Sequence, residues 1–465
     1  MKTQEEIKDI EKELAYKPEH IAIRCPEDIE KADAFCEDYK EFLDLSKTER
    51  EVVNTILMMA EERGFKEFDP KKKLKKGDKI FFNNRGKSVI LATIGKKPLD
   101  EGVRFDIAHG DCPRLDLKGR PLMEKDGFAL LKTHYYGGIR KYQWTALPLA
   151  MHGVVVLKNG KKIEIRIGEE PKDPRFMISD LLPHLSKTQD ERKLSEGVKG
   201  EELNIIVGNI PFAAEGVKNP VKLAVLYILN DRYGIKEQDL ETAEIEMVPA
   251  EKAVDIGFDR SMISAYGQDD RSCAYSAVMA AFDVTEPEHT SITVITDKEE
   301  IGSYGNTGMS SWYLHHFCED LCDVMGVKVR DMYRNSLCVS SDVSAAYDPT
   351  FSDVFEKQNN CQLGYGPVLE KYTGARGKSS ASDASAETIA RIAGILENEG
   401  VVYQTGELGK VDAGGGGTIA HFVADMDVDT IDLGVPVLSM HAPYELTSKL
   451  DIYHTYKAFS AFLRS

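Results

Sequence analysis

Five short stretches rich in histidine and carboxylate side chains each follow a hydrophobic run that is typical of a β-strand. They are His109 to Asp111, Asp269 to Asp270, Asp297 to Glu300, Ser341 to Asp342, and Ser439 to His441. In open α/β sheets, functional side chains gather outside the carboxyl ends of the strands. Brought to one such edge, the five stretches would supply ligands for two divalent metals and a spare glutamate that could act as a base. The pattern therefore indicates a two-metal hydrolase on an α/β fold.

The composition excludes several other classes of protein. A chain of 465 residues is too long for one ordinary core, so two domains are expected. The net charge of -18 argues against a nucleic-acid partner, which would need a basic face. No apolar run is long enough to span a membrane, and the charged N-terminus lacks the apolar region of a secretory signal. The eight scattered cysteines form no CxxC pair, so reduced thiols in a cytoplasmic protein are expected.

Strands and helices alternate in the first quarter and the last half of the chain. The first 65 residues show helical periodicity, and strands are predicted at 79–82, 88–94 and 104–108. After residue 253 the predicted elements are strands at 291–296, 336–340 and within 430–440, and helices at 310–325, 384–398, 416–425 and 445–463. This alternation predicts a sheet with helices on its faces.

The stretch between these two regions is β-rich. The sequence Asn159-Gly160 lies between two runs of strand-forming residues, which predicts a β-hairpin with a type I′ turn. Further strands are expected at 204–207 and 245–248, with one helix at 221–233. We therefore predict a discontinuous α/β domain of residues 1–118 and 252–465, with a β-rich domain of residues 119–251 inserted into it. This arrangement would bring His109 close to ligands far along the chain.

Two of the five stretches have a local structural explanation that competes with metal binding. His109 and Asp111 lie two residues apart and would face the same side of an extended chain, so Asp111 could fix the tautomer of a metal-binding His109. The alternative is a turn with a helix-capping aspartate. Asp269 and Asp270 precede an apolar segment at 274–282, where they could cap a helix or supply a carboxylate that bridges two metals.

The other three stretches are also ambiguous when taken singly. Adjacent glutamates at a strand end can diverge, so Glu299 or Glu300 could bind metal while the other acts as a general base. The alternative is a solvated acidic turn. Asp342 and His441 each end a predicted strand, and a lone histidine in such a place is more often structural than a ligand. Together, however, the five stretches favour the metal interpretation, because independent accidents at five strand ends are improbable.

The ordered set of motifs resembles the aspartyl aminopeptidase/aminopeptidase I family of dinuclear zinc aminopeptidases. The markers run over nearly the whole chain and are AHGDCPRLDLK, YGQDDRSCAYSA, TDKEEIGSYG, SSDVSAAYDP, GGGGTIA and GVPVLSMHAPYE. The resemblance implies a zinc-exopeptidase-like α/β fold with a mixed sheet, helices on both faces and an inserted β-rich dimerisation domain. It also implies removal of the N-terminal residue from peptides by a two-metal mechanism with a bridging water.

The resemblance assigns roles to individual residues. One metal would take His109, Asp342 and a shared Asp269, and the other would take Glu300, His441 and the same Asp269. Glu299 would be the general base, and Asp111 would support His109. His184, in the inserted domain, would enter the active site of a neighbouring subunit and stabilise the oxyanion; the alternative is an ordinary surface histidine. The relatives have Asp-Asn-Leu where Asp269-Asp270-Arg271 stands, so either aspartate could bridge; we choose Asp269 because of its offset from the following helix.

The preferred substrate and the assembly are left as hypotheses. One hypothesis is a preference for substrates with an acidic N-terminal residue. In eukaryotic relatives an Asn-Gln-Arg-Tyr segment lies near the substrate, and Thr373 to Lys378 replace it here, so the resemblance does not secure this preference. Four loop cations could pair with an acidic side chain or could simply be solvated: Lys371, Arg376, Lys378 and Lys410. The metals are expected to be zinc, with cobalt or manganese as alternatives. The assembly is expected to be at least a dimer, with a tetrahedral dodecamer as the leading hypothesis.

Three rival functions remain open at this point. The same metal scaffold supports carboxypeptidases and amide deacylases, in which the loop cations would hold a substrate carboxylate. A non-catalytic assembly or cargo-binding protein on a degenerate peptidase fold is a further alternative. That last alternative predicts the loss of a metal ligand or of the base, and the sequence retains all of them.

Overall fold

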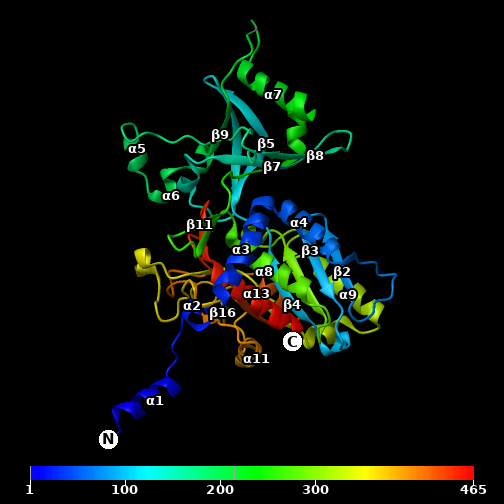
Figure 1. Cartoon of the computed structure of the whole chain (residues 1–465). Helices are drawn as coiled ribbons and strands as arrows, with labels where there is room; N and C mark the ends of the chain where they lie inside the picture. Colours follow the sequence, from blue (N-terminus) through cyan, green and yellow to red (C-terminus); the bar gives the residue numbers. More distant parts are fainter. Residues whose placement is uncertain (1, 214) are drawn as a thin grey trace.

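The computed structural model describes residues 2–213 and 215–465. A nine-stranded mixed sheet forms the centre of the larger part of the molecule (Figure 1). In spatial order its strands are β1 (Lys66–Glu67), β2 (Lys79–Asn84), β3 (Ser88–Thr93), β13 (Ser291–Thr296), β4 (Arg104–His109), β14 (Leu337–Ser340), β18 (Asp429–Gly434), β16 (Val368–Glu370) and β17 (Gln404–Thr405). The central strands β13, β4, β14 and β18 are parallel and almost wholly buried. Their carboxyl ends therefore open on one edge of the sheet.

Helices cover both faces of this sheet, because successive strand residues point to opposite sides. One face packs against α3 (Asp28–Leu45), α4 (Glu49–Glu62), α8 (Gln268–Asp283), α11 (Ala386–Asn398) and α13 (Lys449–Arg464). The other packs against α9 (Tyr313–Met325), α10 (Val329–Arg334) and α12 (Ala420–Ala424). On β3, for example, Leu91 belongs to the first core and Ile90 to the second. The predicted fold class, a mixed α/β sheet with helices on both faces, is confirmed.

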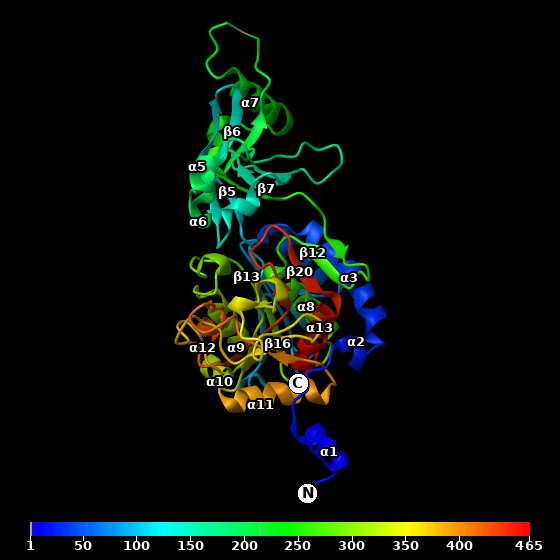
Figure 2. The ribbon, with the colours of Figure 1, turned by 90° about the vertical axis from the view of Figure 1, so that its left-hand side faces the viewer.

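A separate antiparallel sheet projects from this body (Figures 1 and 2). In spatial order its strands are β8 (Lys162–Ile167), β7 (Leu149–Val156), β10 (Ala243–Pro249), β5 (Arg114–Lys125), β6 (Phe128–Tyr136) and β9 (Asn204–Gly208). Its core is distinct and includes Trp144, Ile205 and Met247, with α7 (Pro220–Tyr233) packed against it. The predicted hairpin is present as β7 and β8. Since β5 begins at Arg114, it crosses the predicted domain boundary after residue 118.

A third sheet, of five short strands, was not predicted from the sequence. In spatial order its strands are β11 (Val254–Ile256), β12 (Met262–Ala265), β20 (Glu445–Ser448), β19 (Pro436–Leu438) and β15 (Ser344–Ala345). The prediction that residues 445–463 form one helix was wrong at its start. Glu445–Ser448 pair with β12 on one side and β19 on the other, and α13 begins only at Lys449. Helix α12 is also shorter than predicted, since the glycines before it favour irregular backbone.

The N-terminal segment lies outside the body of the molecule. Helix α1 (Gln4–Leu14) extends away from it and buries no side chain, and the short α2 (Ile21–Arg24) joins the body (Figures 1 and 2). Two further short helices, α5 (Lys187–Asp190) and α6 (Leu194–Gly197), lie beside the antiparallel sheet. Within residues 2–213 and 215–465, no helix is long and apolar enough to cross a membrane.

Candidate metal centre

Three of the predicted stretches lie at the carboxyl ends of adjacent parallel strands. His109 is the last residue of β4 and is buried. Glu299 and Glu300 follow β13, in a short turn of 3-10 helix, and Asp342 follows β14. Because β13 and β14 lie on either side of β4, the three strands deliver these side chains to one edge of the sheet.

The other two stretches reach the same place from the five-stranded sheet. Asp269 follows β12 at the start of α8, and His441 follows β19. The two oxygens of Asp269 face different histidines: Oδ1 lies 3.3 Å from His109 Nε2, and Oδ2 lies 3.1 Å from His441 Nε2. Asp269 therefore occupies the position between the two histidines that a bridging carboxylate would require.

The remaining carboxylates extend this arrangement on both sides. Asp342 Oδ1 lies 3.8 Å from His109 Nε2, and Glu300 Oε2 lies 3.5 Å from His441 Nε2. Asp270 Oδ2 accepts a hydrogen bond of 3.2 Å from the His109 backbone N–H. Two overlapping sets of three residues have ligand atoms within 4.8 Å of one another: His109, Asp269 and Glu300, and His109, Asp270 and Asp342.

The donor set fits divalent metal ions. His109 Nε2 and Glu300 Oε1 are buried and have no hydrogen-bond partner within the described residues. Unpartnered buried polar atoms are costly, and a metal ion would satisfy both of these. Imidazole nitrogens and carboxylate oxygens are ligands that zinc accepts in catalytic sites.

Asp111 connects His109 to the two glutamates. Its backbone oxygen lies 3.0 Å from His109 Nδ1, which leaves Nε2 directed at the carboxylates. Its side chain accepts hydrogen bonds from the backbone N–H groups of Glu299, at 3.1 Å, and Glu300, at 3.3 Å. Tyr136 donates a third hydrogen bond, of 2.8 Å, to the same carboxylate. Asp111 thus fixes the position of the turn that carries both glutamates.

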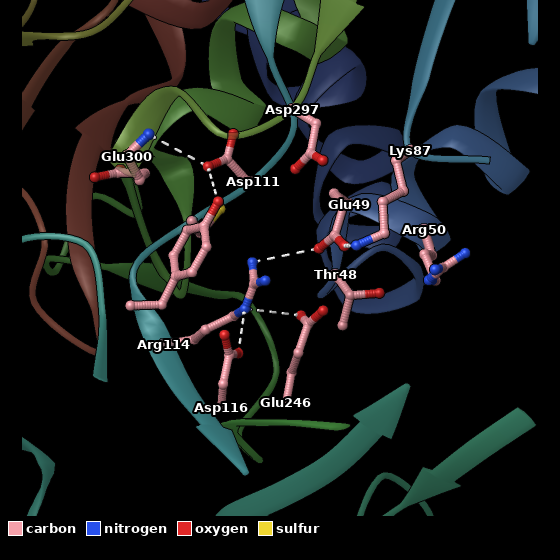
Figure 3. Close-up of polar contacts among 12 residues, drawn as sticks. Thr48, Glu49, Arg50, Lys87, Asp111, Arg114, Asp116, Glu246, Asp297 and Glu300 are labelled. Carbon is pink, nitrogen blue, oxygen red and sulfur yellow. Dashed lines mark hydrogen bonds and ion pairs between the residues drawn. The ribbon is translucent and has the colours of Figure 1, made fainter. Parts of the chain in front are cut away.

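Buried charges continue from Asp111 to the junction between the two parts of the molecule (Figure 3). Arg114 lies against the Tyr136 ring, 3.9 Å from its centroid, and its guanidinium is 3.2 Å from Glu246 and 3.3 Å from Glu49. Glu49 begins α4 and is also 3.0 Å from Lys87. Arg114 and Glu246 belong to the antiparallel sheet, whereas Glu49 and Lys87 belong to the α/β part. The placement of the two parts is therefore linked to the metal centre.

His441 is supported by groups that the sequence analysis did not single out. Its Nδ1 lies 2.9 Å from the carbonyl oxygen of Gly138, in the loop after β6. A side chain at position 138 would approach this Nδ1 to 3.3 Å, so the loop passes very close to the ring. Glu445 accepts hydrogen bonds from the backbone N–H of His441, at 2.7 Å, and of Asp269, at 2.9 Å. The first contact is made by a backbone carbonyl, so no sequence pattern indicated it.

Burial and neighbouring charges shift the pKa values in the site. Burial, reinforced by the nearby Asp342 carboxylate, raises the pKa of Glu299 to about 8. Burial lowers the pKa of His441, but the hydrogen bond to Asp269 and the charge of Glu300 outweigh this effect and raise it to about 11. Clusters of strongly perturbed groups are characteristic of catalytic sites.

A cavity of about 620 Å³ opens beside these residues. Glu299, Glu300, Asp269, Asp342 and His441 line it near the metal centre, and the glycine-rich segment 415–417 lines it on another side. None of the four predicted loop cations lines it. Lys378 is 2.9 Å from Asp383, and Lys410 donates to the Asp353 carbonyl oxygen at 2.6 Å. His184 is exposed in the segment between β8 and α5 and does not line this cavity either.

Comparisons with known proteins identify a family of zinc metalloproteases. Residues 42–463 match the family model described as aminopeptidase I zinc metalloprotease (M18). The probable M18 family aminopeptidase 1 of Clostridium acetobutylicum is 48% identical over 435 residues, which cover 92% of this chain and 94% of that relative. A crystal structure of an M18 aminopeptidase from Thermotoga maritima is 43% identical, has a TM-score of 0.92 and covers 97% of this chain and 99% of its own.

More distant structures share the fold alone. The mApe1 dodecamer of S. cerevisiae is 20% identical, with a TM-score of 0.75, and the similarity covers 93% of this chain and 97% of that one.

Proposed function

The chain belongs to the aminopeptidase I (M18) family of zinc metalloproteases, and we propose that its metalloaminopeptidase activity uses two metal ions that share Asp269. The observation that carries this proposal is the position of Asp269, with one oxygen toward His109 and the other toward His441. His109 and Asp342 would complete one set of ligands, and Glu300 and His441 the other. The family indicates zinc, and cobalt or manganese remain alternatives for this ligand set.

The side chains around the centre have separable tasks. When bound, the metals would supply Lewis acidity and lower the pKa of a coordinated water. Glu299 would take the proton from the water that attacks the first peptide carbonyl, and would then give this proton to the leaving amine as the C–N bond breaks. Asp111 would hold Glu299 and Glu300 in place through their backbone N–H groups. The free α-amine of the substrate would lie near Glu300 and Asp342.

A blocked N-terminus tests the exopeptidase assignment. We expect the zinc-loaded protein to release the first residue of a short peptide and to leave the Nα-acetylated form of the same peptide intact, as measured by chromatography of the products. A carboxypeptidase would cleave both peptides at the other end, and an amide deacylase would release acetate from the blocked one. Cleavage of neither peptide would favour the non-catalytic alternative.

We further propose that the site is completed by His184 of a second copy. His184 is exposed and lies outside the cavity of its own chain, so it could reach a site only in a neighbouring chain. There it would stabilise the oxyanion formed during attack, a role in which one donor typically contributes about 3 kcal/mol. A dimer would then be the smallest active unit. A tetrahedral dodecamer remains the proposed full assembly.

Hybrid oligomers test this shared site. His184→Ala and Glu299→Gln chains should each be nearly inactive alone, because each lacks one part of every site. Mixed oligomers should regain part of the wild-type activity, since some sites would combine an intact His184 with an intact Glu299. Mixed oligomers that form, as shown by two affinity tags, yet regain no activity would contradict the proposal.

A further inference from the structure

Two buried carboxyl groups face each other at the part of the cavity formed by β16 and β18. Glu370 is the last residue of β16, and Asp432 lies directly opposite it in the antiparallel pair. Both side chains line the cavity, and both residues are 4% exposed. Directly opposed residues of neighbouring strands point to the same face of a sheet. These carboxyl groups therefore form one acidic surface, distinct from the predicted metal ligands.

This pair is costly for the folded protein. Like charges directly opposite each other destabilise a sheet, and within the described residues no Lys, Arg or His side chain forms an ion pair with either group. Their side-chain partners are hydroxyl groups: Ser344 donates to Glu370, and Thr418 donates to Asp432 at 2.7 Å. Burial accordingly raises the pKa of Glu370 to about 8 and that of Asp432 to about 7. A costly arrangement of this kind is typical of a binding site.

A third polar group in the same cavity lacks a partner. Thr373 is 7% exposed and lines the cavity, and its Oγ1 makes no hydrogen bond within residues 2–213 and 215–465. An unpartnered hydroxyl in a buried position indicates that a ligand supplies the missing hydrogen bond. Glu370, Asp432 and Thr373 together offer hydrogen-bond acceptors, and a bound cation would stabilise the charged forms of both carboxyl groups. The cavity lining contains no Lys or Arg among the described residues.

We infer that this surface receives the side chain of the substrate's N-terminal residue and that it selects lysine or arginine over aspartate or glutamate. The inference rests on the proposed function, because it assigns a specificity to the same cavity. An ammonium or guanidinium group has only hydrogen-bond donors and would neutralise the opposed carboxylates. An acidic side chain would bring a further carboxylate to the pair and no positive group to balance it. The hypothesis of a preference for acidic N-terminal residues is thereby reversed.

A substrate panel tests the inference with the zinc-loaded oligomer. The substrates are tripeptides X-Ala-Ala in which X is Lys, Arg, Leu, Glu or Asp, and kcat/KM is measured for each. We expect kcat/KM for Lys and Arg to exceed that for Glu and Asp by about 100-fold, since placing like charges together is costly. Equal values, or a preference for Glu and Asp, would overturn the inference while leaving the proposed function intact. Failure to release any N-terminal residue would instead refute the proposed function.

Variants of Glu370 show whether this carboxyl group sets the preference. The readout is the ratio of kcat/KM for Lys-Ala-Ala to that for Glu-Ala-Ala, because the fraction of active protein cancels in it. Glu370→Gln should lower this ratio about tenfold, and Glu370→Lys, if it folds, should bring it below one. Glu407→Gln is the matched control, since Glu407 bonds to Tyr372 nearby but does not line the cavity; it should change the ratio far less than Glu370→Gln does. An unchanged ratio in Glu370→Gln would overturn the inference.

Discussion

Replacement of Glu299 by glutamine is expected to lower kcat by about 10²- to 10⁴-fold while the protein keeps its metals. Glutamine has nearly the same shape as glutamate, but it cannot take a proton from the attacking water. The backbone hydrogen bond from residue 299 to Asp111 is preserved in the variant, so the turn should keep its position. The measurement is steady-state hydrolysis of a tripeptide, together with metal content by atomic emission.

The control for this variant removes a negative charge from the same turn. Asp297 is buried and accepts a hydrogen bond of 2.6 Å from Thr307, but it does not line the cavity. Asp297→Asn should therefore reduce kcat far less than Glu299→Gln. If a Glu299→Gln protein with its normal metal content kept full turnover, Glu299 could not be the general base.

The second large effect is expected at Asp269. Asp269→Asn should lose metal from both positions and with it the peptidase activity, because one amide cannot replace two charged oxygens that face different histidines. Removal of groups that merely support ligands already costs about 10- to 100-fold in metal affinity, so loss of a shared ligand should exceed that range. Metal affinity is measured by competition with a chelator of known affinity.

Asp270→Asn is the matched comparison, since it removes a buried carboxylate from the adjacent residue. Asp270 bonds to the His109 backbone and lies near Asp342 in one of the two possible ligand sets. A weaker effect is therefore expected, confined to one metal. If Asp270→Asn lost both metals and Asp269→Asn kept them, the bridging role would pass to Asp270.

The sequence allowed the meeting of these histidine and carboxylate side chains to be predicted because strand ends place them by local rules. His109, Glu300 and Asp342 each follow a hydrophobic strand, and parallel strands bring their carboxyl ends together. The five-stranded sheet could not be predicted in the same way. It joins five strands that are only two to four residues long and come from distant parts of the chain, such as β12 and β20, so their pairing depends on tertiary contacts rather than on periodicity.

The groups around the ligands were also beyond the reach of sequence patterns. Gly138 acts through its backbone carbonyl, which carries no residue-specific signal, and Tyr136 reaches Asp111 from the end of β6. Glu370 and Asp432 lie far apart in the chain and meet only through strand register. The charges of the four loop cations are visible in the sequence. Their exposure, and the bonds that Lys378 and Lys410 make to other residues, are not visible there.

The central claim is that two metals share Asp269, and anomalous diffraction at the zinc absorption edge tests it most directly. Crystals of the zinc-loaded protein should show two peaks per chain on either side of Asp269. One should lie beside His109 and Asp342, and the other beside Glu300 and His441. A single peak per chain at saturating zinc, or two peaks joined by Asp270 rather than Asp269, would contradict the account.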